Sequence, residues 1–289
     1  MLPDTHDTEQ PLKVEVILPV RISEHGDAVH WLRQAVESIF NQTLHSWHLT
    51  IVDDASPIGS LEFINQLCVS YPDKCSQIRL PNQMGAAYAR MVAVENSKSR
   101  FISFLDQDDL FHPEKLKLQT EYLEENPQIH AVHTDVNLIN PTGAIIDGAA
   151  DGENGYRKKV DGMSLDKREL ASELFQRNSI RIISSMFRRY SFQQVGGYDC
   201  SLNGGEDWEL WVRFADQFDI AHLGEKLLER RVHDNNTSMV QLKVRLSGQL
   251  MALTKMTEKY RYLEPFAGRK RELIEKKLQS LQAETGVGA

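Results

Sequence analysis

Residues 100–109 read RFISFLDQDD, an apolar segment that ends in three carboxylates. FISFL is a short apolar run of the kind that forms a buried strand. The carboxylates after it, Asp106, Asp108 and Asp109, therefore stand where the strand leaves the core. The segments on either side indicate which kind of sheet holds this strand.

The chain before this stretch alternates between strand-like and helix-like patterns. Apolar runs predict strands at residues 14–20, in WHLTIVDDAS and in SQIRLPN. Helices are predicted between them, one around Leu61–Val69 and another that begins at Gly85. This alternation predicts a parallel sheet flanked by helices. The first helix, in AVHWLRQAVESIFNQT, would bury a face formed by Trp31, Leu32, Ala35, Val36 and Ile39.

Polar residues follow three of the predicted strands where each strand ends. Pro19 closes the first strand, Asp53 and Asp54 follow the second, and the carboxylates of DQDD follow the fourth. In open sheets of this type, ligands bind outside the carboxyl ends of the strands. The sequence therefore predicts a functional site at this edge.

The second half of the chain is less regular. IHAVHTDVNLIN and RIISSMFRR resemble strands, and EDWELWVRFA resembles a helix with acidic residues at its start. The polar segment DGAADGENGYRKK is expected to be a mobile loop, either a lid or a plain surface loop. Beyond Met239 a helical C-terminal region is predicted, because Leu242, Leu246, Leu250 and Leu253 recur at helical spacing.

The DQDD carboxylates have two readings. A single-residue gap in an extended segment points Asp106 and Asp108 to the same side. Two hard carboxylates placed in this way could hold Mg²⁺ or Mn²⁺, with substrate phosphates as the remaining ligands. The alternative is a solvated acidic loop that caps the next helix. The position at the ligand-binding edge favours the metal.

Two further acidic pairs also have structural alternatives. Either Asp53 or Asp54 could accept hydrogen bonds from a nucleobase or ribose, or could cap the segment that follows. Glu206 and Asp207 open an aromatic helix beside Trp208. A carboxylate in such a partly apolar place can act as a general base, although acidic residues at a helix start also stabilise the helix dipole.

A series of short motifs runs along the chain. From first to last they read LPVRIS, LRQAVESIFNQT, IVDDAS, QMGAAYAR, FLDQDD, HPEKL, VHTDVNLIN, SSMFRR, VGGYD, EDWELWVR and RRVHDNNTS. Their order and their coverage, roughly residues 14–239, resemble those of the inverting family 2 glycosyltransferases. Two positions depart from the family pattern: Met91 replaces a usual asparagine, and PNQMG differs by one residue from the common NxG.

The resemblance implies a GT-A fold, which is a Rossmann-like α/β fold with a central, mostly parallel sheet flanked by helices, here with a C-terminal helical appendage. It divides the chain into a flexible N-terminus at 1–13, a GT-A domain at 14–239 and a helical extension at 240–289. Within the GT-A domain we expect a nucleotide-binding half at 14–110 and an acceptor-binding half at 111–239.

The resemblance also implies a donor site for a nucleotide-diphosphate sugar. Pro19, Val20 and Asp54 match the positions that hold the base and the ribose. Arg90 matches an arginine that lies near the base or the phosphates. UDP is the expected nucleotide, since it is common in families of this kind.

A divalent metal, Mn²⁺ or Mg²⁺, is implied as cofactor. Asp106 and Asp108 match the DxD pair, with Asp108 the stronger candidate for a direct metal ligand and Asp109 a further candidate. His233 matches a histidine that completes the metal site or contacts the diphosphate. Asp207 matches the catalytic base.

The implied mechanism is a direct displacement. Asp207 would take the proton from an acceptor hydroxyl as its oxygen attacks the anomeric carbon, and the metal would stabilise the leaving diphosphate. One displacement inverts the anomeric centre. The acceptor is expected to be a glycan or a lipid-linked molecule, contacted by Glu206 and by the ring of Trp208. Trp211 is expected in the core.

Composition limits the choice of partners. The formal charge of −8 argues against broad nucleic-acid binding, which needs a basic face. Residues 241–289 carry ten Lys or Arg against five Glu and are therefore basic. The C-terminal helices could pack on their own domain, which is the default, or form a homodimer or contact a membrane surface. No apolar run is long enough for a membrane span, and the N-terminal residues do not resemble a secretory signal, so a cytoplasmic protein is expected, either free or peripheral to the inner face of the membrane.

Three other classes compete with an active transferase. A binding module that has lost turnover would keep the fold, but all three acidic sites are retained here. A nucleotidyltransferase would need a glycine-rich, basic phosphate loop near the first strand, and LPVRISEHG is a poor match. A Rossmann dehydrogenase is disfavoured because no GxGxxG follows the first strand.

Overall fold

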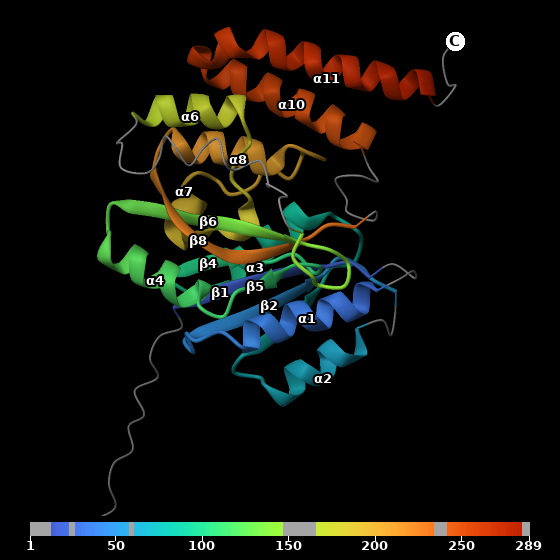
Figure 1. The fold of residues 1–289 in the computed structure, drawn as a ribbon, viewed down its shortest axis with the longest axis vertical. Coiled ribbons are helices and arrows are strands. Elements are labelled where there is room, and N and C mark those ends of the chain that lie inside the picture. The colour runs from blue at the N-terminus through green and yellow to red at the C-terminus, as the bar shows by residue number, and fades with distance from the viewer. Residues whose placement is uncertain (1–12, 23–26, 58–60, 147–165, 234–241, 285–289) are drawn as a thin grey trace, which may run out of the picture.

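The computed structural model describes residues 13–22, 27–57, 61–146, 166–233 and 242–284. It is a mixed α/β protein with a central sheet, as predicted. In Figure 1, α1 and α2 lie on one side of the sheet, α6 and α8 lie on the other, and α10 and α11 stack beyond these. The predicted segments at residues 1–12 and in DGAADGENGYRKK lie outside the described residues.

The helices are α1 (Ala28–Phe40), α2 (Glu62–Ser70), α3 (Ala86–Asn96), α4 (Lys115–Glu125), α6 (Lys167–Gln176), α7 (Arg189–Gln194), α8 (Glu206–Ala215), α10 (Leu242–Lys259) and α11 (Glu264–Glu284).

Strands from both halves of the chain join one sheet. Within the described residues it has eight strands in the order β3-β2-β1-β4-β7-β6-β8-β5. The pairs β1–β2, β1–β4, β2–β3 and β6–β8 are parallel, and the remaining three pairs are antiparallel. The strands are β1 (Val14–Val20), β2 (Trp47–Asp53), β3 (Cys75–Arg79), β4 (Phe101–Phe104), β5 (Leu110–Phe111), β6 (Ile129–Ile139), β7 (Met186–Arg188) and β8 (Asp219–Arg231).

The first four strands confirm the prediction of a parallel unit. All seven residues of β1 are buried, and so are all four of β4, because helices cover both faces of this part of the sheet. The face predicted for the first helix is buried as well. Residues that end neighbouring strands lie side by side, with Val20 opposite Asp53 and Asp53 opposite Arg79.

The second half differs from the prediction at two strands. RIISSMFRR forms a 3-10 turn, Ile182–Ser184, followed by the three-residue strand β7. The longest strand, β8, was not predicted. Its pairing with β6 has irregular register near Asp135, so the apolar alternation that identifies a strand is interrupted there.

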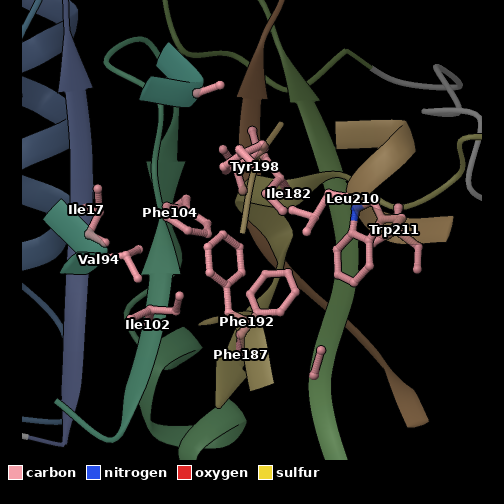
Figure 2. Packing of buried hydrophobic residues seen from close by; sticks show 14 of the residues in the cluster. Ile17, Val94, Ile102, Phe104, Ile182, Phe187, Phe192, Tyr198, Leu210 and Trp211 are labelled. Carbon is pink, nitrogen blue, oxygen red and sulfur yellow. The ribbon is translucent and has the colours of Figure 1, made fainter. Parts of the chain in front are cut away.

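The core centres on aromatic residues from the middle of the sheet and from α8. Phe104 of β4, Phe187 of β7 and Phe192 of α7 lie against one another in Figure 2, with ring centroids 5.4 to 6.2 Å apart. Trp211 stacks on Phe187 at 4.9 Å and is fully buried, which confirms its predicted place in the core. Through this cluster, α8 is anchored directly over the strands that end at the predicted site.

The C-terminal helices share this core. Leu246, Leu253 and Met256 of α10 are at most 3% exposed, and α10 packs on α8. This confirms the default prediction that the C-terminal region packs against its own domain. None of the described helices is long and apolar enough to cross a membrane.

A buried histidine in the sheet predicts a pH-dependent stability. His133 of β6 stacks on His222 of β8 at 4.7 Å and is 2% exposed. Burial, with a smaller contribution from His222, lowers the pKa of His133 well below its ordinary value. The unfolded chain binds a proton near pH 6.5, whereas the folded chain does not. His133 therefore contributes stability that is complete above that pH and is lost as the pH falls.

We expect the free energy of unfolding to fall by about 1 kcal/mol more in the wild type than in His133→Phe between pH 6.5 and 5.5. Urea denaturation of both proteins at the two pH values measures this difference. The phenylalanine keeps a ring against His222 and removes the titrating group. Equal losses in the two proteins would contradict a buried, neutral His133.

Candidate active site

The candidate site lies where β1, β2 and β4 end, facing the start of α8. Asp106 and Asp108 follow β4, as predicted, and Asp207 approaches from the first turn of α8. Parallel strands bring their carboxyl ends to one edge, and the anchoring of α8 in the aromatic core brings its N-terminus to the same place. Residues more than a hundred positions apart therefore meet there.

Arg90 connects the acidic residues to one another. It lies on α3 and is 4% exposed. One terminal nitrogen donates to Oδ1 of Asp106 at 2.6 Å, and the other lies 3.7 Å from Oδ1 of Asp207 and 3.3 Å from the hydroxyl of Tyr198. Burial opposes the charge of the guanidinium, but its neighbours, Tyr198 first among them, outweigh burial and raise the pKa of Arg90. The arginine is therefore a fixed positive charge between two carboxylates.

The carboxylates carry more negative charge than Arg90 neutralises. Burial raises the pKa of Asp106 above its ordinary value, against the effect of Arg90, and the nearby charges of Asp108 and Asp207 raise it further. The contributions of Asp108 and Asp207, which are smaller than that of burial, come from repulsion between ionised carboxylates. A cation bound beside them would relieve the repulsion.

Asp108 and His233 form the pair best suited to hold that cation. His233 follows β8, and its Nε2 lies 2.9 Å from Oδ2 of Asp108. The imidazole packs on the ring of Trp31 with centroids 4.4 Å apart, which fixes its orientation. A carboxylate oxygen and an imidazole nitrogen suit Mn²⁺, and such sites take their remaining ligands from substrate phosphates and water. Among the described residues, no group of three or more His, Cys, Asp or Glu is placed to hold a metal.

Asp109 has a different role from the one expected of it. It is 3% exposed, and its Oδ1 accepts a hydrogen bond from the backbone nitrogen of Arg231 at 2.7 Å. Burial raises the pKa of Asp109 well above its ordinary value. It is thus turned toward β8, and the expectation that it adds a metal ligand is corrected.

Arg231 is a residue that the sequence reading missed. Its guanidinium is fully buried and donates to the carbonyl of Asp108, to that of Pro141 and to Oε1 of Gln34, each at 2.9 Å. It therefore holds the backbone of Asp108 against three other elements. Its position in RRVH, two residues before the candidate metal ligand His233, could have identified it as a residue of the site.

A second corner of the site is formed by the ends of β1 and β2. Pro19 and Val20 are buried, and the carbonyl of Val20 accepts a hydrogen bond from the backbone of Asp54 at 2.8 Å. The carboxylate of Asp54 accepts from the backbone nitrogens of Met84 and Gly85, at 2.6 and 2.9 Å. Asp54 thus holds the loop that leads into α3, from which Arg90 projects.

The neighbouring aspartate of this corner caps the chain. Oδ1 of Asp53 accepts from the backbone nitrogen of Ser56 at 2.8 Å, and Oδ2 pairs with Arg79. Ala55, which lies between Asp54 and Ser56 in the chain, has a φ of 57°, in the left-handed region that is uncommon for alanine. Such local strain tends to occur at functional sites.

Gln107 joins this corner to the carboxylates and was also missed. Its side chain accepts from the backbone nitrogen of Arg21 at 2.8 Å and donates to the carbonyl of the same residue at 3.0 Å. Because Gln107 stands between Asp106 and Asp108, these two bonds fix the course of the chain through the acidic segment.

The first turn of α8 presents the candidate base. The side chain of Asp207 is 32% exposed, and its Oδ1 lies 3.7 Å from a terminal nitrogen of Arg90. Glu206 beside it is half-buried, and burial raises the pKa of Glu206, with a further contribution from Asp207. Burial also raises the pKa of Tyr198, so that its hydroxyl stays protonated beside Asp207.

Trp208 lies away from the site. It is 2% exposed, and its indole nitrogen donates to the carbonyls of Leu174 and Phe175 at the end of α6, at 3.0 and 3.1 Å. Lys270 of α11 covers the ring at 4.2 Å and donates to the carbonyls of Phe175 and Gln176. The expectation that Trp208 stacks on an acceptor sugar is therefore corrected: the ring joins three helices inside the protein.

This arrangement of carboxylates, arginine and histidine at the edge of an α/β sheet agrees with what the chain resembles. The model of the family described as Glycosyl transferase family 2 matches residues 16–175, more than half of the chain. The chain belongs to glycosyl transferase family 2. This membership is what the sequence motifs predicted.

Several relatives are similar over most of this chain. An uncharacterized glycosyltransferase from Rickettsia bellii is 27% identical over 88% of the chain, and the chain spans 34% of that protein. Hyaluronan synthase from Pasteurella multocida is 25% identical over 83% of the chain, which spans 22% of the synthase. The chain thus corresponds to about a third or less of these two longer proteins.

Solved structures support the GT-A type of fold. The mannosyltransferase PcManGT from Pyrobaculum calidifontis, in complex with GDP-Man and Mn²⁺, has a TM-score of 0.65 at 14% identity, over 98% of this chain and 78% of its own. TarS from S. aureus, in complex with UDP-GlcNAc, has a TM-score of 0.61 at 15% identity, over 85% of this chain and 66% of its own. These likenesses concern the fold.

Proposed function

We propose that this family 2 enzyme transfers a sugar, with inversion, from a nucleotide-diphosphate donor to a hydroxyl group of a glycan or lipid-linked acceptor. The observation that carries the proposal is the meeting of Asp106 and Asp207 at Arg90, with Asp108 two residues after Asp106 and 2.9 Å from His233. We take a UDP-sugar as the donor, of the hexose or N-acetylhexosamine type. The solved neighbours bind UDP-GlcNAc in one case and GDP-Man in the other.

The donor would lie along the corner formed by β1 and β2. Pro19, Val20 and Asp54 are our candidates for the residues beside the base and the ribose, and each lies at the carboxyl edge of the sheet. The carboxylate of Asp54 already holds two backbone nitrogens, but each of its oxygens has a further lone pair for a ribose or base donor.

A divalent cation would complete the diphosphate site. Asp108 and His233 would hold it, with Asp106 beside them, and the cation would stabilise charge on the leaving diphosphate when bound. Arg90 stays cationic in this place and would attract the phosphates, while its bond to Asp106 keeps that carboxylate in position.

Asp207 would act as the general base. Its side chain is 32% exposed and can reach a hydroxyl group, and the guanidinium of Arg90 lies 3.7 Å from its Oδ1. As the acceptor oxygen forms its bond to the anomeric carbon, the proton passes to Asp207. The bond from that carbon to the diphosphate breaks, and its electron pair leaves with the diphosphate. Glu206 is our candidate for contact with the acceptor.

Calorimetric titration of UDP, GDP, CDP and dTDP, each with and without Mn²⁺, tests the proposal. We expect UDP to bind most tightly, and to bind more tightly with Mn²⁺ than without it. If GDP binds most tightly instead, the donor is a GDP-sugar and the proposed reaction is otherwise unchanged. If none of the four nucleotides binds to the folded protein, the transferase proposal is wrong and a binding module that has lost turnover becomes the better reading.

A further inference from the structure

The helix α10 makes backbone contact with the turn that precedes the candidate base. A Cβ built at Gly248 would overlap the carbonyl oxygens of Asn203 and Gly204 and would lie 2.6 Å from the carbonyl carbon of Asn203. A Cβ built at Gly204 would lie 2.5 Å from the Cα of Arg245. No side chain fits between the two backbones, so the turn and the helix have a single way of packing.

This turn determines where α8 begins. Gly204 and Gly205 have φ values of 110° and 82°, conformations that other residues rarely adopt. Glu206 and Asp207 follow immediately as the first residues of α8. A displacement of the turn therefore displaces Asp207 with respect to Arg90.

Two more contacts fix α10 along the same segment. Lys255 donates to Asp199 at 2.6 Å and to the hydroxyl of Ser201 at 2.8 Å. Asp199 directly follows Tyr198, whose hydroxyl accepts the hydrogen bond from Arg90. The helix thus touches the segment 199–205 at both ends, and this segment connects Tyr198 with Asp207.

We infer that α10 positions the general base, and that Gly248 is a positioning residue for sugar transfer. The helix α10 packs against the turn at Asn203 and Gly204 and in this way fixes the distance between Asp207 and Arg90. The C-terminal helices are then a structural part of the active site and not an appendage. This inference rests on the proposed function, since it takes Asp207 to be the base.

Gly248→Ala tests the inference, with Gly268→Ala of α11 as the matched control. The added methyl group at position 248 must push the turn away, whereas a Cβ at Gly268 meets nothing within 4 Å. Turnover can be followed with water as acceptor, as the release of UDP from UDP-GlcNAc or of GDP from GDP-mannose. We expect Gly248→Ala to lower kcat about 10-fold with an unchanged Kd for the nucleotide, since small misplacements of reacting groups are costly. Gly268→Ala should leave both unchanged.

A double-mutant cycle separates positioning from general damage. In the Asp207→Asn background, Gly248→Ala should lower turnover less than 2-fold, because the group that it misplaces is already gone. A full 10-fold fall in that background, or an unchanged kcat in the single variant, would overturn the inference. If Asp207→Asn alone keeps full turnover, the part of the proposed function that fails is the assignment of Asp207 as the base, while sugar transfer itself stands.

Lys255→Met provides a second variant in case Gly248→Ala does not fold. The Lys255 side chain is 42% exposed, so its replacement leaves the helix packing in place. We expect kcat to fall about 3-fold, the Kd for the nucleotide to stay unchanged, and the effect to disappear in the Asp207→Asn background. An additive effect in that background would likewise overturn the inference.

Discussion

Asp207→Asn is expected to lower turnover by about 10²- to 10⁴-fold, the range that general-base catalysis supplies. Asparagine keeps the shape of the side chain but cannot accept the proton from the acceptor hydroxyl. Nucleotide and metal binding should remain within about 2-fold of the wild type, because the proposed donor site lies on β1, β2 and the segment after β4. Turnover is measured as nucleoside diphosphate release, and binding by calorimetry.

Asp216→Asn is the matched control for this experiment. It makes the same chemical change at the other end of α8, where Asp216 accepts a hydrogen bond from the hydroxyl of Tyr262 at 2.7 Å. Asparagine can still accept that bond, so activity should be retained. Near-wild-type turnover in Asp207→Asn would remove Asp207 as the base and would direct attention to Glu206, whose Oε2 has no hydrogen-bond partner among the described residues.

Asp108→Ala is expected to abolish the effect of Mn²⁺ on nucleotide binding. The variant removes the carboxylate closest to His233 and leaves one protein ligand of the proposed pair. Loss of a residue that only supports a metal ligand costs about 10- to 100-fold in affinity, so loss of a ligand should cost at least about 100-fold. Titration of UDP at several Mn²⁺ concentrations measures the change.

The adjacent aspartate gives a control of similar charge and location. Asp109→Asn keeps an oxygen for the backbone nitrogen of Arg231, and burial already raises the pKa of Asp109 well above its ordinary value. Metal dependence should therefore survive in this variant. If Asp108→Ala retains the full response to Mn²⁺ while Asp109→Asn loses it, the metal site has been assigned to the wrong aspartate.

The sequence predicted the fold and the site best where a residue pattern has a single structural meaning. Apolar runs that end in carboxylates predicted both the parallel strands and the edge at which Asp106 and Asp108 lie. The helical spacing of Trp208 and Trp211 placed them on one side of a helix, but spacing does not tell whether that side faces a core or a ligand. The structure places both rings in the interior.

Contacts between distant segments were beyond the reach of the sequence pattern. Arg231 donates a hydrogen bond to the backbone carbonyl of Asp108. Every residue has such a carbonyl, so no sequence motif identifies the one that an arginine contacts. From the sequence alone, a glycine at position 248 indicates only a weaker helix, because glycine lowers helix propensity. Its meaning depends on the neighbouring backbone of Asn203, 45 positions earlier in the chain.

The contact between Lys270, Trp208 and the end of α6 also has a consequence for biosynthesis. A ribosome makes residues 167–176 and 206–215 well before it makes α11. Until Lys270 emerges, the carbonyl of Gln176 has to be satisfied by water and the outer face of the Trp208 ring stays uncovered. Contacts between such distant segments form slowly. The nascent chain therefore acquires a fully supported α8 only after Lys270 has been made.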